Sequence, residues 1–102
     1  MESKVKNSTF ITLSHTMKNT STYTADSMHT EGYNFSSQIP AGYSIMAIRG
    51  VQASGGYFLT SSFYISGTSV YAILNAKIAI APNTYNITFD IVCCKTELLG
   101  TV

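Results

Sequence analysis

The amino-acid sequence predicts a single all-β domain, an antiparallel β-sandwich or jelly-roll-like fold. Apolar and polar residues alternate with a period of two in several segments, and no helical period persists. Turns rich in Gly, Pro, Asn and Ser separate these segments. The count is seven or eight short strands, which is typical of a sandwich or jelly roll. The length of 102 residues fits one domain. We place it at residues 8–102, with residues 1–7 as a leader or linker.

The clearest strand is expected over residues 85–93, where one face is apolar and the other polar. Such alternation is typical of a strand that packs one face on a core. The apolar face consists of Tyr85, Ile87, Phe89, Ile91 and Cys93.

A hairpin is expected upstream, from a strand over residues 57–65 to a strand over residues 69–74. Strict alternation puts Leu59 and Phe63 on one face of the first strand and Phe58 and Tyr64 on the other. Both faces are therefore partly apolar, which favours a strand covered on both sides. Gly67 lies at the tight turn between the two strands.

The remaining elements are shorter. Strands are expected over residues 8–14 and 43–51, and a short strand or extended connection over residues 77–81. Residues 19–24 are polar and β-branched, which is typical of an edge strand. Residues 16–18 and 25–29 are expected to form loops, and residues 33–35 lead into the turn at Pro40.

Charged residues are scarce, at 11% of the chain with a net charge of +1. The six basic residues are scattered, which argues against a nucleic-acid partner, because a phosphate-binding surface needs clustered Lys and Arg. Between Glu31 and Lys77 the only charged residue is Arg49. This stretch is either a core stretch with Ser/Thr-rich turns or a surface buried against other copies of the chain, since subunit interfaces are depleted in charge.

No segment approaches the roughly 20 apolar residues of a membrane-spanning helix, so membrane insertion is not expected. The N-terminal residues lack the apolar run of a signal peptide. Cys93 and Cys94 are adjacent, and neighbours in a strand point to opposite faces. We expect two free thiols, one facing a core and the other facing outward or into an interface. A redox pair is disfavoured because no His or CxxC context accompanies them.

The sequence contains no recognisable catalytic or metal-binding pattern, so neither an enzyme nor a cofactor is expected. His15 and His29 are the only histidines, and we interpret them as surface residues in loops. The five carboxylates are dispersed, with Asp90 on the polar side of the best strand. There is no GxSxG nucleophile elbow, and residues 54–57 lack the Lys and helix of a phosphate loop.

The seven tyrosines are the remaining chemical feature. A tyrosine ring offers a flat apolar face and a hydroxyl, which suits interfaces and sugar stacking, although most tyrosines half-bury against a sheet. The candidate ligand-binding residues are Tyr33, Tyr57, Tyr64 and Tyr71. The candidate oligomer-interface residues are Ile45, Ala47, Phe58 and Tyr64.

Residues 36–96 carry a resemblance to a known family. They contain the turn Ile-Pro-Ala-Gly-Tyr at 39–43, the hairpin around Gly67, an isolated Asn75 and a last strand ending at residue 95. This order resembles the C-terminal head domains of tail-fibre and baseplate proteins from phages and prophages of Gram-positive bacteria. Cys93 and Cys94 depart from it, since such final strands more often end in aliphatic or aromatic residues. The resemblance implies a homotrimeric β-sandwich located in a virion tail, and it carries over no catalytic residue.

We therefore expect a non-catalytic domain for trimerisation and for attachment to a host cell-surface saccharide. The alternative is a monomeric carbohydrate-binding or adhesion module of a larger surface protein, located extracellularly or at the cell surface. It would expose a groove lined by tyrosines instead of a buried axis. A small hydrolase is a third and weaker hypothesis.

Overall fold

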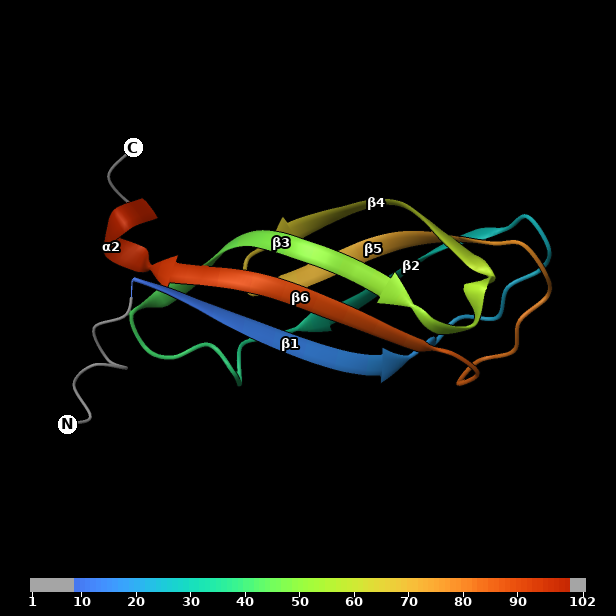
Figure 1. The fold of residues 1–102 in the computed structure, drawn as a ribbon, viewed down its shortest axis with the longest axis horizontal. Helices are drawn as coiled ribbons and strands as arrows, with labels where there is room; N and C mark the ends of the chain where they lie inside the picture. Colours follow the sequence, from blue (N-terminus) through green and yellow to red (C-terminus); the bar gives the residue numbers. More distant parts are fainter. Residues whose placement is uncertain (1–8, 100–102) are drawn as a thin grey trace.

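Two three-stranded antiparallel sheets stack face to face in the computed structural model, which describes residues 9–99 (Figure 1). This confirms the predicted all-β sandwich. The expected leader at residues 1–7 lies outside the described residues. The first sheet has the order β1-β6-β3, with β1 (Phe10–Lys18), β6 (Asn86–Lys95) and β3 (Tyr43–Ala53). The second has the order β2-β5-β4, with β2 (Met28–Asn34), β5 (Ser69–Ala76) and β4 (Phe58–Ser66).

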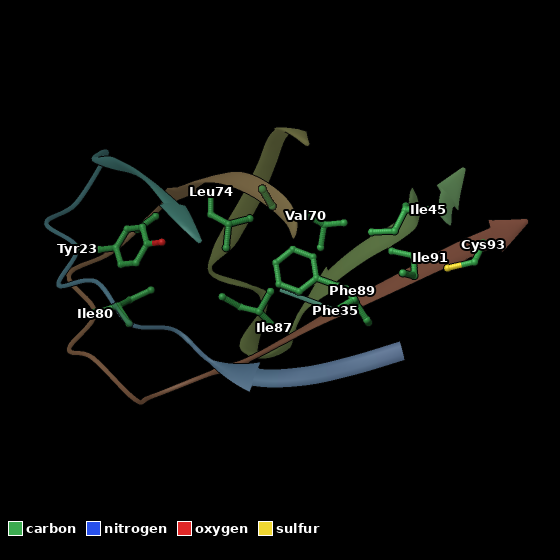
Figure 2. Close-up of a cluster of buried hydrophobic side chains, with 12 residues drawn as sticks. Tyr23, Phe35, Ile45, Val70, Leu74, Ile80, Ile87, Phe89, Ile91 and Cys93 are labelled. Atoms are coloured by element: carbon green, nitrogen blue, oxygen red, sulfur yellow. The ribbon is translucent and has the colours of Figure 1, made fainter. Parts of the chain in front are cut away.

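The core lies between the sheets and is centred on the two middle strands. Every second residue of β5 and β6 is buried, because a strand in the middle of a sheet directs alternate side chains into the core. The alternation predicted for residues 85–93 is confirmed in β6. Figure 2 shows Phe89 and Leu74, from opposite sheets, among the side chains of this cluster. The inward-facing buried residues of the two strands are Val70, Ala72, Leu74, Ala76, Ile87, Phe89, Ile91 and Cys93.

The described residues contain six strands, fewer than the seven or eight expected. Residues 19–24 and 77–81 form loops, and among the described residues one isolated β-bridge, between Tyr23 and Ile80, pairs their backbones. The Asn19 side chain holds these loops together. Its amide nitrogen donates to the carbonyls of Ser21 and Ala81 at 3.2 and 3.0 Å. Its amide oxygen accepts from the backbone N–H groups of Thr84 and Tyr85 at 3.0 and 2.8 Å. The buried Asn19 side chain thus supplies hydrogen bonds to backbone groups that strand pairing would otherwise satisfy.

The histidines are not in loops, contrary to the expectation. Residues 15–18 belong to β1, and residues 28 and 29 belong to β2. His15 faces inward and stacks on Tyr33, with ring centroids 3.5 Å apart. His29 also faces inward and meets the ring of Tyr23 edge to face at 4.8 Å. Both side chains are half-buried.

Strand β4 differs most from its prediction. A register shift between Thr60 and Ser62 inserts one extra residue and reverses the alternation beyond it. Phe63 and Ile65 consequently pair with buried β5 residues and face inward, whereas Leu59 and Tyr64 face outward. Leu59 and Phe63 therefore do not share a face. The strand is not covered on both faces, because its outward-facing Leu59 and Tyr64 are exposed. β4 is also an edge strand, on the upper side of the molecule in Figure 1.

Short elements complete the fold. The turn η1 (Ser54–Gly56) connects the two sheets between β3 and β4, and α2 (Thr96–Leu99) follows β6 at the other end of the molecule (Figure 1). The expected tight turn at Gly67 is confirmed, and this residue has a positive φ of 62°. Within residues 9–99, no helix has the length and apolarity required to cross a bilayer.

Candidate functional site

The outward face of the β2-β5-β4 sheet is uncharged and partly apolar. The register of the two strand pairs assigns it alternate residues of each strand. Leu59 is 59% exposed, Met28 is 56% exposed and Tyr64 is 48% exposed, so apolar groups on this face lie open to solvent. We call it the tyrosine face, and its central residues are Met28, Thr30, Leu59, Ser62, Tyr64, Tyr71, Ile73 and Asn75.

Two stacked tyrosines lie at the centre of the tyrosine face. Tyr64 and Tyr71 are directly opposite each other in the β4–β5 pair, and their ring centroids are 5.1 Å apart with an interplanar angle of 25°. Tyr71 in turn pairs with Gly32 of β2, where its ring covers the space that a β-carbon would occupy. Glycine in a strand interior often marks such a close approach. Gly32 therefore positions the Tyr71 ring, and Tyr71 positions the Tyr64 ring.

Neutral polar groups share this face with the tyrosine pair. Thr30 and Ser62, in the row of residues next to the pair, are exposed. Farther along the face, the Ser61 hydroxyl donates to the Asn75 side-chain oxygen at 3.1 Å. Hydroxyl and amide groups both donate and accept hydrogen bonds without carrying charge. The face thus combines the exposed Tyr64 ring and the half-buried Tyr71 ring with hydroxyl and amide groups, which can pack against and hydrogen-bond a neutral polyhydroxylated ligand.

The absence of charge on this face follows from where the few charged residues lie. Glu31 is the only charged residue of the β2-β5-β4 sheet, and its side chain points into the core and is 1% exposed. The outward face of the other sheet carries Lys18 and Asp90, and Arg49 lies at an exposed bulge of β3. The stretch between Glu31 and Lys77, in which Arg49 is the only charged residue, therefore contributes both core positions and most of the tyrosine face.

The structure brings together two of the four tyrosines named as ligand-binding candidates. Tyr64 and Tyr71 form the stacked pair, but Tyr33 faces inward, where its hydroxyl accepts a hydrogen bond from the Gln38 amide at 3.1 Å. Tyr57 precedes β4, at the opposite end of that strand from Tyr64, and its ring is tilted against Tyr85 with centroids 5.7 Å apart. The sequence alternation could not separate these cases, because the fold alone determines which strand faces meet.

The four residues named for an oligomer interface do not form one surface. Ile45 faces inward and belongs to the buried core. Phe58 also faces inward and packs edge to face on Tyr23 at 5.0 Å. Ala47 lies half-buried on the outward side of β3, whereas Tyr64 lies on the tyrosine face of the other sheet. Of the four, Tyr64 alone is exposed.

A buried carboxylate is a feature that the sequence did not reveal. Oε1 of Glu31 accepts hydrogen bonds from the backbone N–H and the hydroxyl of Thr20, at 3.0 and 2.6 Å. Its Oε2 accepts from the Ser21 N–H at 3.3 Å and the Tyr23 hydroxyl at 2.8 Å. These four hydrogen bonds satisfy both oxygens of the buried carboxyl group. The cluster attaches the 19–27 loop to β2.

The two cysteines are free and both are buried, on opposite faces of β6. Cys93 belongs to the core cluster, as expected for one of the pair. Burial, with Cys94 beside it, raises the pKa of the Cys93 thiol. A thiol of raised pKa is a poor nucleophile, which fits a packing role.

One open pocket of about 360 Å³ lies at the α2 end of the molecule. It is lined by Ala41, Gly42, Tyr43, Lys95, Thr96 and Glu97. No group of three or more metal-ligating side chains occurs among residues 9–99. The pocket lies at the α2 end of the molecule, whereas the tyrosine face lies on the β2-β5-β4 sheet, so the two are separate features.

Comparisons with protein-family models, with curated proteins and with solved structures gave no match to this chain.

Proposed function

We propose that this chain is a non-catalytic attachment domain that binds a neutral cell-surface saccharide on the tyrosine face. The resemblance to the head domains of phage tail fibres gives the biological setting, namely a virion tail that contacts a host surface. The single observation that carries the proposal is the stack of the exposed Tyr64 ring on the half-buried Tyr71 ring, at the centre of an uncharged sheet face.

The chemistry of the face supports a sugar over a charged ligand. The C–H groups of a sugar ring are apolar and pack against an aromatic ring, while its hydroxyls need neutral donors and acceptors nearby. Ser62 and Thr30, in the row of residues next to the stacked pair, supply such groups, and Asn75 supplies an amide farther along the face. A phosphorylated or sulfated ligand would need Lys or Arg, and no residue of the tyrosine face is charged.

A glycan array followed by titration calorimetry tests the proposal. Tyr71→Ala and Tyr64→Ala should each weaken binding of the selected neutral glycan by about tenfold or more, the effect expected for truncating a central aromatic contact. Tyr57→Ala is the matched control, because Tyr57 is an exposed tyrosine outside the face and should leave the affinity unchanged. Circular dichroism would establish that each variant is folded.

Two results would contradict the proposal. The first is an array on which the folded protein binds no neutral glycan. The second is binding that depends on Tyr57 but not on Tyr64 or Tyr71. An adhesion module of a larger surface protein would bind in the same way, and the parent gene separates that alternative from a phage tail.

A further inference from the structure

The edge strand β4 leaves the sandwich core incompletely covered. Phe63 and Ile65 face the inner side of their sheet, yet they are 45% and 37% exposed. Among the described residues, both lie outside the core cluster and the side chains packed against it, whereas Phe58 of the same strand packs on that cluster. The core is therefore open to solvent along the second half of β4.

The other three edge strands differ from β4 in two respects. Their inward apolar side chains pack against the core, as Leu13 of β1 and Val51 of β3 do. Two of them also carry an exposed charge, namely Lys18 in β1 and Arg49 in β3, and in β2 the buried Glu31 carboxylate bonds residues 20–23. Proteins protect sheet edges with charges, prolines and bulges. Residues 62–66 contain none of these, because the bulge of β4 precedes them.

The backbone of Phe63 and Ile65 points to the open edge. The loop after β4 has two residues, Gly67 and Thr68. The residues that flank it, Ser66 and Ser69, therefore form a hydrogen-bonded pair, in which the N–H of each bonds to the C=O of the other. Hydrogen-bonded and non-hydrogen-bonded pairs alternate along an antiparallel ladder. Tyr64 and Tyr71 are therefore the next hydrogen-bonded pair, whereas Phe63 and Ile65 direct their N–H and C=O groups away from β5. These groups are available to another strand.

The exposed segment is also nearly palindromic. Residues 62–66 read Ser-Phe-Tyr-Ile-Ser, so the residues on either side of Tyr64 match in kind. If two copies pair antiparallel about Tyr64, Phe63 lies opposite the partner's Ile65, and Ser62 lies opposite the partner's Ser66. The outward N–H and C=O groups of Phe63 then bond with those of the partner's Ile65, giving about four hydrogen bonds across the twofold axis. No charge is brought against a like charge.

We infer that β4 is a self-association edge, at which a second copy of this chain pairs antiparallel about Tyr64. The two β2-β5-β4 sheets then form one continuous six-stranded sheet with an isologous twofold interface. Phe63 and Ile65 gain cover from the partner's Ile65 and Phe63. The twofold also places the two tyrosine faces side by side, but the pairing itself does not depend on saccharide binding.

Sedimentation velocity tests the inference. A single pair of strands buries a small area, so the dimer is weak and the titration must extend to about 1 mM. Phe63→Lys should raise the dimer dissociation constant by about tenfold or more, because an inward-pointing charge blocks edge pairing. Leu59→Lys is the matched control, since it adds the same charge to the outward side of the same strand. Ile65→Lys serves as a second variant if Phe63→Lys fails to fold.

A cross-linking experiment tests the register. Tyr64 lies on the axis, so Tyr64→Cys places two thiols opposite each other at a non-hydrogen-bonded pair, where the strands approach closely enough for a disulfide. Mild oxidation should give a covalent dimer of Tyr64→Cys but not of Ser62→Cys, which faces the partner's Ser66. The native cysteines are buried and should not contribute.

The expected results are a dimer, its loss in Phe63→Lys and the cross-link in Tyr64→Cys. A monomer at all concentrations would overturn the inference, as would the trimer that the resemblance implies. A dimer that persists in Phe63→Lys would exclude this edge, and a dimer without the Tyr64→Cys cross-link would exclude this register. Phe63 faces inward, so Phe63→Lys should abolish the dimer without changing the affinity for the saccharide. The two proposals can therefore be disproved independently.

Discussion

Tyr71 lies over Gly32 on the outward face of the β2-β5-β4 sheet, so that its ring fills the space a β-carbon would need. An alanine at this position would overlap the ring and approach the Val70 carbonyl oxygen at 3.0 Å. We expect Gly32→Ala to lower the free energy of unfolding by about 1–3 kcal/mol, as overpacking does. Urea denaturation measures this loss. Gly50→Ala is the control, because nothing lies within 4 Å of its added β-carbon, and an equal loss in both variants would contradict the role of the ring.

Asn19 replaces a strand pair in joining the 19–24 and 77–85 loops. Asn19→Ala removes the side chain that bonds four backbone groups, so we expect a loss of about 2–4 kcal/mol in the free energy of unfolding. Amide hydrogen exchange should accelerate at Thr84 and Tyr85 before it does in β5 or β6. Asn86→Ala removes an exposed asparagine one residue beyond this loop and should change stability by less than about 0.5 kcal/mol. Unchanged exchange at Thr84 in Asn19→Ala would show that the loops close without it.

Glu31 requires acceptor oxygens on both sides of its carboxylate. Glu31→Gln preserves the shape but turns an NH₂ group toward hydrogen-bond donors from Thr20 or from Ser21 and Tyr23. We expect the free energy of unfolding to fall by about 1–3 kcal/mol. Glu97→Gln, an exposed carboxylate on α2, should have no measurable effect on thermal unfolding. Equal stability of the two variants would mean that the acceptor oxygens of Glu31 contribute nothing to the free energy of unfolding.

Tyr23 should make the fold sensitive to alkaline pH. Burial, followed by the hydrogen bond to Glu31 and its negative charge, raises the pKa of Tyr23 above its ordinary value of 10.0. In the unfolded chain this proton is lost at lower pH, so above about pH 10 the folded state binds more protons than the unfolded state. The contribution to stability is therefore complete below that pH and is lost as the pH rises further.

Denaturant titrations across that pH range measure the effect. The free energy of unfolding of the wild-type protein should fall more steeply with pH than that of Tyr23→Phe, which lacks the titrating hydroxyl. Tyr57→Phe removes an exposed hydroxyl and should keep the wild-type slope. Parallel slopes for wild type and Tyr23→Phe would show that the buried phenol does not govern the alkaline limit.

The sequence by itself determined the fold class, the turn at Gly67 and the inward face of β6, because alternation of apolar residues is a local signal that burial enforces on a central strand. It also determined that the surface carries little charge. It failed at β4, where one extra residue at Ser61 reversed the alternation, and at the loops that Asn19 joins, where polar β-branched residues suggested a strand.

Only the tertiary structure decided which tyrosines meet. Tyr64 and Tyr71 stack because their strands pair in one register and because Gly32 on a third strand leaves room for a ring. It also decided that Glu31 is buried and that Phe63 faces an open edge. Each of these relationships joins residues from different strands or loops, or depends on what a neighbouring strand leaves uncovered. Such relationships arise from packing between elements, which the periodicity of any single element does not contain.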